Sequence, residues 1–305
     1  MRILLVGRTG LIGSAISARL SAEGHECVLV SRHPTATPGT HHIVFDMART
    51  TDASRWKGIL AGVDAVINAA GALQGQDMQG VHVAGSATLY SACESAGIRR
   101  VILFSAIGTD RDARSDFSRT KQEGEAALMA RNLDWVVLRP SVVVGRPAYG
   151  GSALLRGLAS LPALPDMPDT AAIQPVYLDD VVETVLFFLQ PGAPSRIALD
   201  LAGPRQMAFS DAVALFRRWL RWRPAHRLHL PAWAALAFIV QETWRKGSAG
   251  ARPSIRRRRR KCGAVRPAIP DPGVRRPASC HAILQPRSPA SRPRCRNAGL
   301  RSYTR

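Results

Sequence analysis

Near its start the chain reads Ile3-Leu4-Leu5-Val6-Gly7-Arg8-Thr9-Gly10-Leu11-Ile12-Gly13. Its first four residues form a continuous apolar run, which is typical of a strand buried on both faces. Leu11 to Glu23 then shows apolar residues at helical spacing, so the glycines lie in a strand-to-helix turn. Glycine permits a tight turn at Gly7, close approach of a ligand at Gly10 and close helix packing at Gly13. Because backbone N–H groups at a helix start attract anions, this loop predicts a pyrophosphate site.

Strand-like and helical segments alternate behind the glycine loop. The strand-like segments are 27–30, 43–45, 65–68, 101–104, 135–138 and 197–201, and the helical segments are 81–96, 117–132 and 179–189. This order predicts an α/β fold, a doubly wound parallel sheet of the Rossmann type with right-handed crossovers. A dinucleotide held by the glycine loop would lie across the carboxyl ends of the strands.

The alternation loosens after Gly145, where several prolines mark irregular connections. Residues 145–175 and 190–244 are predicted to form most of a small C-terminal lobe over the strand ends, where substrates of such folds bind. Within the lobe, Ser210 is predicted to be the N-cap of a helix. The predicted dinucleotide-binding domain with its lobe spans residues 1–244.

The last part of the chain has a different composition. Residues 245–305 hold 18 basic residues against one acid, Asp271, which is +17 of the formal +20 of the whole chain. Leu, Ile, Val and Phe number only 7 there, a composition typical of disorder at high net charge. Two interpretations stay open. One is a segment translated out of frame; the other is a basic arm whose run Arg256–Lys261 binds polyanions without aromatic stacking.

Several classes of site are not predicted. No apolar run reaches the ~18 residues that span a bilayer. The adjacent His41 and His42 would face opposite sides of a strand, so no metal site is expected. The five cysteines show no paired spacing, which fits a reducing compartment. With a strand starting at Arg2, no leader is expected, and the prediction is a cytoplasmic protein of open oligomeric state.

The end of the second strand discriminates between the two nicotinamide dinucleotides. Sites that prefer NAD place an acidic residue there for the ribose 2′-hydroxyl, whereas this strand ends in Ser31-Arg32-His33. The planar fork of Arg32 suits a 2′-phosphate, and Arg8 in the glycine loop could assist it. The sequence therefore predicts NADP, with NAD less favoured.

Short motifs follow the other predicted strands. They are Asp46, Ala69-Ala70-Gly71, Ser105-Ala106-Ile107-Gly108-Thr109-Asp110, Arg139-Pro140-Ser141 and Pro175-Val176-Tyr177-Leu178-Asp179-Asp180-Val181, with Thr120-Lys121-Gln122-Glu123-Gly124-Glu125 on a helix. Together with the glycine loop they resemble the extended or atypical short-chain dehydrogenases/reductases, which are NAD-dependent epimerase/dehydratase-like proteins. The motif that starts at Ser105 is most similar to the branch of NmrA-like proteins and the accessory subunit of respiratory complex I. The resemblance covers roughly residues 1–240 and does not identify a substrate.

The resemblance implies cofactor contacts at the matching positions. Asp46 would approach the adenine amino group, and Ala69-Ala70-Gly71 would line the cofactor near its ribose. Pro140 and Val143 would flank the nicotinamide. The glycine loop, including Arg8, Thr9, Leu11 and Ile12, would hold the pyrophosphate.

At the catalytic positions the chain departs from the family pattern. The resemblance places Ser105 beside the substrate carbonyl, while Lys121 holds the nicotinamide ribose and lowers the pKa of a tyrosine four residues before it. Phe117 stands at that tyrosine position. A phenyl ring has no ionisable hydroxyl, and general acid–base catalysis is typically worth ~10²–10⁴ in rate. The usual chemistry should therefore be strongly impaired.

Three functions remain open from the sequence. The first is an NADP-dependent oxidoreductase or epimerase/dehydratase-like enzyme with a displaced acid, such as Ser105 or a water molecule. The second is an NADP(H)-binding sensor or assembly subunit without turnover. The third is polyanion binding through the basic tail.

Overall fold

The structure, a computed structural model, describes residues 1–33, 41–73, 77–111, 114–147, 150–166 and 172–229. Residues 230–244 of the predicted lobe lie outside the described residues. The predicted basic tail 245–305, with its run Arg256–Lys261, also lies outside them.

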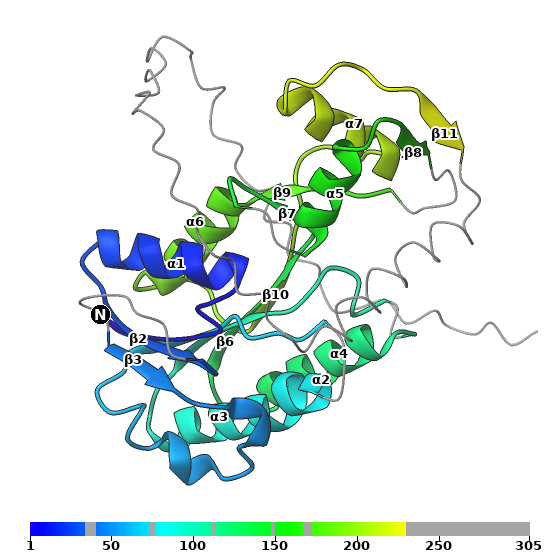
Figure 1. Ribbon diagram of the computed structural model, residues 1–305. Coiled ribbons are helices and arrows are strands. Elements are labelled where there is room, and N and C mark those ends of the chain that lie inside the picture. The colour runs from blue at the N-terminus through cyan, green and yellow to red at the C-terminus, as the bar shows by residue number, and fades with distance from the viewer. Residues whose placement is uncertain (34–40, 74–76, 112–113, 148–149, 167–171, 230–305) are drawn as a thin grey trace, which may run out of the picture.

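A parallel sheet of seven strands forms the centre of the molecule (Figure 1). In spatial order it contains β3 (His41–Val44), β2 (Glu26–Ser31), β1 (Arg2–Val6), β4 (Ala65–Asn68), β5 (Arg100–Phe104), β6 (Asp134–Pro140) and β10 (Ile197–Leu201). Each predicted strand is present, with its ends within two residues of the expected ones. The strand order reverses between β1 and β4, so the predicted doubly wound α/β fold is confirmed.

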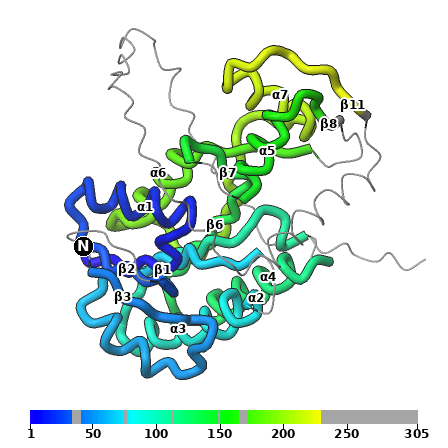
Figure 2. The backbone as a smooth tube through the Cα atoms, in the orientation of Figure 1, coloured from blue at the N-terminus to red at the C-terminus, as the bar shows by residue number. Residues whose placement is uncertain are grey.

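Helices cover both faces of the sheet (Figures 1 and 2). They are α1 (Leu11–Ala22) and α6 (Leu178–Leu189) on one face, and α3 (Gly85–Ser95) and α4 (Asp116–Met129) on the other. Successive residues of β1 point to opposite faces. Ile3 and Leu5 therefore belong to the core under α1 and α6, whereas Leu4 and Val6 belong to the core under α3 and α4. Both sets are fully or nearly fully buried, which explains the unbroken apolar run.

Several short helical turns were absent from the sequence prediction. They are α2 (Asp77–Gln79), two 3₁₀ turns (Met47–Arg49 and Ala53–Trp56) and a π-helical turn (Gly80–Ala84) that leads into α3. The predicted helix 81–96 is thus split into a π turn and a shorter α-helix. Helix α3 begins where the chain passes very close to the 3₁₀ turn: a Cβ atom at Gly85 would lie 2.1 Å from the carbonyl oxygen of Met47.

A small lobe lies at one end of the sheet (Figure 1). It contains α5 (Gly151–Ala159), α7 (Phe209–Trp219), β8 (Leu164–Asp166) and β11 (Arg227–His229), and the short pair β7 (Val143–Val144) and β9 (Val176–Tyr177) lies at its base. Leu155, Leu158 and Val213 belong to its separate apolar core. The prediction missed α5, although its buried residues Ser152, Leu155 and Ala159 recur at helical spacing.

Residues 197–201 form the predicted strand, β10, which pairs in parallel with β6 at the edge of the main sheet, although the segment falls in the range from which most of the lobe was predicted. One prediction about this region is wrong. Ser210 is not an N-cap. Helix α7 already runs at that point, since the N–H groups of Asp211 and Ala212 both donate to the carbonyl oxygen of Ala208 at 3.1 Å.

Candidate functional site

A cavity of about 840 Å³ opens at the carboxyl ends of the central strands, between the sheet and the lobe. This volume is in the range of small-molecule sites. Most residues singled out from the sequence line it: Gly7, Thr9, Gly10, Leu11, Ile12, Gly13, Arg32, Ala69, Ala70, Gly71, Ser105, Phe117, Lys121, Pro140 and Val143. Arg8 and Asp46 do not. The lobe adds Ser152, Ile173, Gln174 and Gln206, none of which the sequence indicated.

The glycines of the loop are required for different reasons. Gly7 has a φ of +86°, and a Cβ atom there would lie 2.5 Å from the backbone of Ala69. A Cβ atom at Gly13 would lie 2.3 Å from the carbonyl oxygen of Gly7. At Gly10 the closest atom would be 3.5 Å away, which is ordinary contact. The fold therefore requires glycine at positions 7 and 13. At Gly10 the backbone has room for a side chain, but that side chain would occupy space on the cavity side.

The start of α1 faces the same cavity. No side chain caps this helix at Gly10, and its first turn has no acidic residue. The N–H groups of a first helical turn have no partners within the helix and carry the positive end of its dipole. Leu11, Ile12 and Gly13 line the cavity at this point, so the loop fits the anionic pyrophosphate of a dinucleotide.

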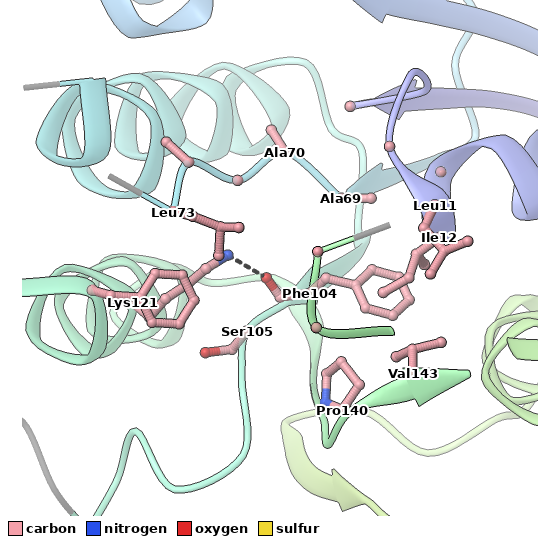
Figure 3. Close-up of a pocket in the computed structure, with 18 of the residues that line it drawn as sticks. Leu11, Ile12, Ala69, Ala70, Leu73, Phe104, Ser105, Lys121, Pro140 and Val143 are labelled. Carbon is pink, nitrogen blue, oxygen red and sulfur yellow. Dashed lines mark hydrogen bonds between the residues drawn. The ribbon is translucent and has the colours of Figure 1, made fainter. Parts of the chain in front are cut away.

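Lys121 lies at the opposite end of the cavity, on α4 (Figure 3). Its Nζ atom donates a hydrogen bond to the carbonyl oxygen of Phe104 at 2.9 Å. Burial lowers the pKa of its amine to about 8. A Cβ atom at Gly71 would lie 3.6 Å from this Nζ atom, so the amine faces the loop that follows β4.

Ser105 lies directly after β5 and also lines the cavity (Figure 3). Its side chain is buried, and its Oγ atom has no hydrogen-bond partner among the described residues. A buried hydroxyl without a partner costs about 1–3 kcal/mol. Buried polar groups are as a rule hydrogen-bonded, so a hydroxyl without a partner beside a cavity calls for an explanation.

Phe117 lies in the first turn of α4, one turn before Lys121 and on the same face. Its ring lines the cavity and contacts the ring of His82 edge-on, with centroids 5.7 Å apart. The neighbouring Ser118 is used in the cap of α4, where Ser115 Oγ accepts from its N–H. Tyr90 and Tyr177, the tyrosines of the described part of the chain, do not line the cavity. Phe117 therefore places a ring on the cavity wall where the resembling family has its tyrosine, but this ring lacks the hydroxyl.

His82 supports this end of the cavity, although the sequence did not indicate it. Its Nε2 atom accepts from the N–H of Ala72 at 3.0 Å, so Nδ1 carries the proton and donates to Thr120 Oγ1 at 2.9 Å. Burial, with the charge of Lys121, lowers its pKa to about 3 and keeps it neutral. His82 thus ties the loop after β4 to α4. It lies in the π turn, and only tertiary contacts reveal its role.

A buried ion pair braces the loop that follows Ser105. Arg139, at the end of β6, donates to both oxygens of Glu125 on α4. Glu125 also accepts from Thr109 Oγ1 at 3.0 Å, and Asp110 lies 3.0 Å from Arg139. These contacts fix the loop between Ser105 and Asp110 against both β6 and α4.

Comparison with known proteins agrees with this geometry. The family described as NAD(P)H-binding matches residues 7–159, about half of the chain. The chain belongs to this NAD(P)H-binding family. The match covers the glycine loop, Ser105 and Lys121.

Individual relatives are distant. An uncharacterized protein of Mycobacterium tuberculosis is 26% identical over 219 residues, which is 72% of this chain and 23% of that protein. The chain thus spans about a quarter of the length of this relative. The ceramide reductase of Caulobacter vibrioides is 21% identical over 192 residues, 61% of this chain and 60% of that enzyme.

The fold is that of the extended short-chain dehydrogenases/reductases, as the sequence motifs predict. A short-chain dehydrogenase/reductase superfamily protein of Agrobacterium tumefaciens with bound NAD superposes with a TM-score of 0.63. It is 18% identical, and the match covers 76% of this chain and 86% of that one.

Arg32 lines the cavity wall directly after β2. Its Nη1 atom donates to Asp77 Oδ2 at 2.9 Å. Asp46 has a different place from the one expected. Its carboxylate accepts from the N–H of Ala48 at 3.1 Å and caps a 3₁₀ turn. The neighbouring residues Phe45 and Met47 line the cavity, whereas Asp46 does not.

Two classes of feature are absent from the described part of the chain. No group of three or more His, Cys, Asp or Glu residues gathers there as metal ligands do. Within the same residues, no helix has the length and apolar character needed to cross a membrane. Cys27 and Cys93 are buried free thiols.

The buried amine of Lys121 predicts a pH dependence of stability for this NAD(P)H-binding domain. Its pKa is about 8 when folded, against an ordinary value of 10.5. Below about pH 8 the amine is protonated in both the folded and the unfolded protein, so the full cost of burying its charge lowers the stability of the folded state. Between the two values the unfolded state binds more protons, so stability should rise with pH, by at most about 1.4 kcal/mol per unit. Urea unfolding across this range should show the rise in wild type and lose it in Lys121→Met. Equal slopes in both proteins would contradict the prediction.

Proposed function

We propose that this chain is an NADP(H)-dependent oxidoreductase whose proton transfer does not use a tyrosine on α4. The observation that carries the proposal is Ser105 Oγ, buried without a partner in the same cavity as Lys121 and the glycine loop. A sensor that only binds a dinucleotide has no use for a buried hydroxyl that lacks a partner next to the cofactor site. A substrate oxygen would supply the missing partner.

Each part of the cavity has a task in this proposal. The glycine loop and the start of α1 bind the pyrophosphate, and Lys121 holds the nicotinamide ribose. The nicotinamide, when bound, supplies or accepts a hydride. Ser105 donates a hydrogen bond to the substrate oxygen, and the apolar ring of Phe117 keeps water from that side.

The lining of the substrate side favours a neutral carbonyl compound. Ile107, Val142 and Ile173 are apolar there. Arg111 is the cation on this side among the described residues, and it is paired with Asp200 and with Asp110. The diphosphate of a nucleotide sugar would therefore find little free positive charge. The relative from Caulobacter vibrioides is by name a reductase of an apolar compound, which supports the same direction. The free thiols of Cys27 and Cys93 fit a reducing compartment, and we place the activity in the cytoplasm.

The proposed cofactor is NADP(H) because Arg32 lines the adenosine end. Replacing Arg32 with alanine should weaken NADPH binding by about tenfold to a hundredfold, since hydrogen bonds to charged groups contribute about 1.5–3 kcal/mol. The affinity for NADH should stay within about threefold. Fluorescence titration of wild type and Arg32→Ala with both nucleotides measures this. A preference for NADH in wild type would overturn the choice of NADP.

Phe117 favours a second candidate, a protein that binds NADP(H) without turnover. The two functions are separated by reaction of the NADPH-loaded protein with a panel of aldehydes, ketones and nucleotide sugars. Oxidation of bound NADPH by any of the carbonyl compounds supports the enzyme. Tight NADPH binding with no oxidation by the whole panel supports the sensor.

A further inference from the structure

Arg32 is paired across the rim of the cavity with an acid from a distant part of the chain. Asp77 begins α2, 45 positions along the chain from Arg32, and receives its Nη1 donor at 2.9 Å. Among the described residues, it is the acid that pairs with Arg32. Arg32 lines the cavity, whereas Asp77 does not. The Arg32 guanidinium thus has a carboxylate partner from outside the cavity lining.

The position of Asp77 does not depend on Arg32 alone. Two residues later on α2, Gln79 Nε2 donates to Glu123 Oε2 on α4 at 3.0 Å. The short helix that carries Asp77 is therefore attached to the same helix that carries Lys121. This contact and the ion pair together place the Asp77 carboxylate beside Arg32.

We propose that Asp77 is a specificity-determining residue that weakens binding of the cofactor's 2′-phosphate and so limits the preference for NADP(H) over NAD(H). This inference rests on the proposed function, in which Arg32 receives the 2′-phosphate. An arginine fork binds a phosphate best with two parallel N–H donors. In this protein Nη1 already donates to a carboxylate, so the phosphate meets a guanidinium whose positive charge is partly neutralised.

Charge acts in the same direction. A 2′-phosphate that contacts Arg32 lies close to the negative charge of Asp77, and like charges repel at this range. The ribose 2′-hydroxyl of NAD(H) is neutral and meets no such repulsion. Both side chains of the pair are about half exposed, at 50% and 59%. The effect should therefore be modest, about three- to fivefold in affinity.

The test uses the full chain and two probes that lack the nicotinamide, 2′-phospho-ADP-ribose and ADP-ribose. Asp77→Asn keeps the size of the side chain and an acceptor oxygen but removes the charge. Calorimetric titration should show that the variant binds 2′-phospho-ADP-ribose about three- to fivefold more tightly than wild type. Its affinity for ADP-ribose should stay within about twofold.

A matched control is available in the lobe. Asp211 accepts from Arg227 at 2.9 Å, the same distance, and that pair is similarly exposed. Asp211→Asn also removes one negative charge, but at a position outside the cavity lining. It should change the affinity for neither 2′-phospho-ADP-ribose nor ADP-ribose. Unaltered thermal unfolding in both variants shows that they are folded.

Two outcomes overturn the inference. One is unchanged or weaker binding of 2′-phospho-ADP-ribose by Asp77→Asn, which would mean that Asp77 positions Arg32 for the phosphate. The other is an equal gain for both probes, which would mean that the 2′-phosphate is not what Asp77 opposes. Arg32→Gln tests the proposed function separately. If that variant binds 2′-phospho-ADP-ribose as wild type does, Arg32 does not read the phosphate, whatever Asp77→Asn shows.

Discussion

Replacing Phe117 with tyrosine should raise turnover of a carbonyl substrate by about 10²–10⁴-fold, the usual contribution of a positioned general acid. The position already lines the cavity, one helical turn before the buried amine of Lys121. A phenol there adds the proton donor that phenylalanine lacks. The positive charge of Lys121 would favour ionisation of that phenol, as an opposite charge lowers the pKa of an acid. Cofactor affinity should change little, because no contact to the glycine loop is altered.

The measurement is NADPH oxidation by wild type and Phe117→Tyr over a panel of aldehydes and ketones. Phe45→Tyr is the matched control, because it adds the same hydroxyl to another wall of the same cavity. Phe45 packs against Trp56 and is distant from Lys121 in the sequence. The Phe45→Tyr substitution should therefore leave turnover unchanged. A wild-type rate that Phe117→Tyr does not increase would show that another group already supplies the proton.

Substitution of the loop glycines by alanine should separate what the fold needs from what the cofactor needs. Gly13→Ala places a Cβ atom 2.3 Å from the carbonyl oxygen of Gly7, so the loop backbone must move. Overpacking against backbone costs about 1–3 kcal/mol or more. Both thermal stability and NADPH binding should fall. Gly10→Ala makes only a 3.5 Å contact, so stability should hold while NADPH binding falls by at least about tenfold.

Gly157→Ala is the control for this series. Nothing lies within 4 Å of its Cβ position on α5, and it does not line the cavity. Alanine in a helix interior is more stable than glycine by about 0.5–1 kcal/mol. This variant should be slightly more stable than wild type and bind NADPH equally well. Wild-type NADPH affinity in Gly10→Ala would mean that the pyrophosphate does not approach the backbone there.

The central fold could be predicted from local patterns. Strand β4 has the predicted bounds, Ala65–Asn68, because each of its residues is buried and the run is apolar up to Asn68. The glycine loop was recognisable because a strand, a tight turn and a helix follow one another within a few residues. Phe117 and Lys121 could be paired from the sequence because a spacing of four fixes their common face on a helix.

Other parts of the site depend on contacts between distant segments. The role of His82 depends on Thr120, 38 positions along the chain, and Arg32 depends on Asp77 in the same way. The lobe was outlined only coarsely, since strand β10 joins β6 by a pairing that spans more than fifty residues.

The sequence by itself thus determined the parallel sheet, the glycine loop between strand and helix, and the absence of a phenol at position 117. These follow from periodicity and residue type within single elements, where neighbours in the chain are neighbours in space. The tertiary structure determined which hydroxyl is left without a partner, which acid faces Arg32 and which histidine joins α4 to the loop after β4. Those depend on how separate elements pack, because burial and charge pairing are properties of the assembled core.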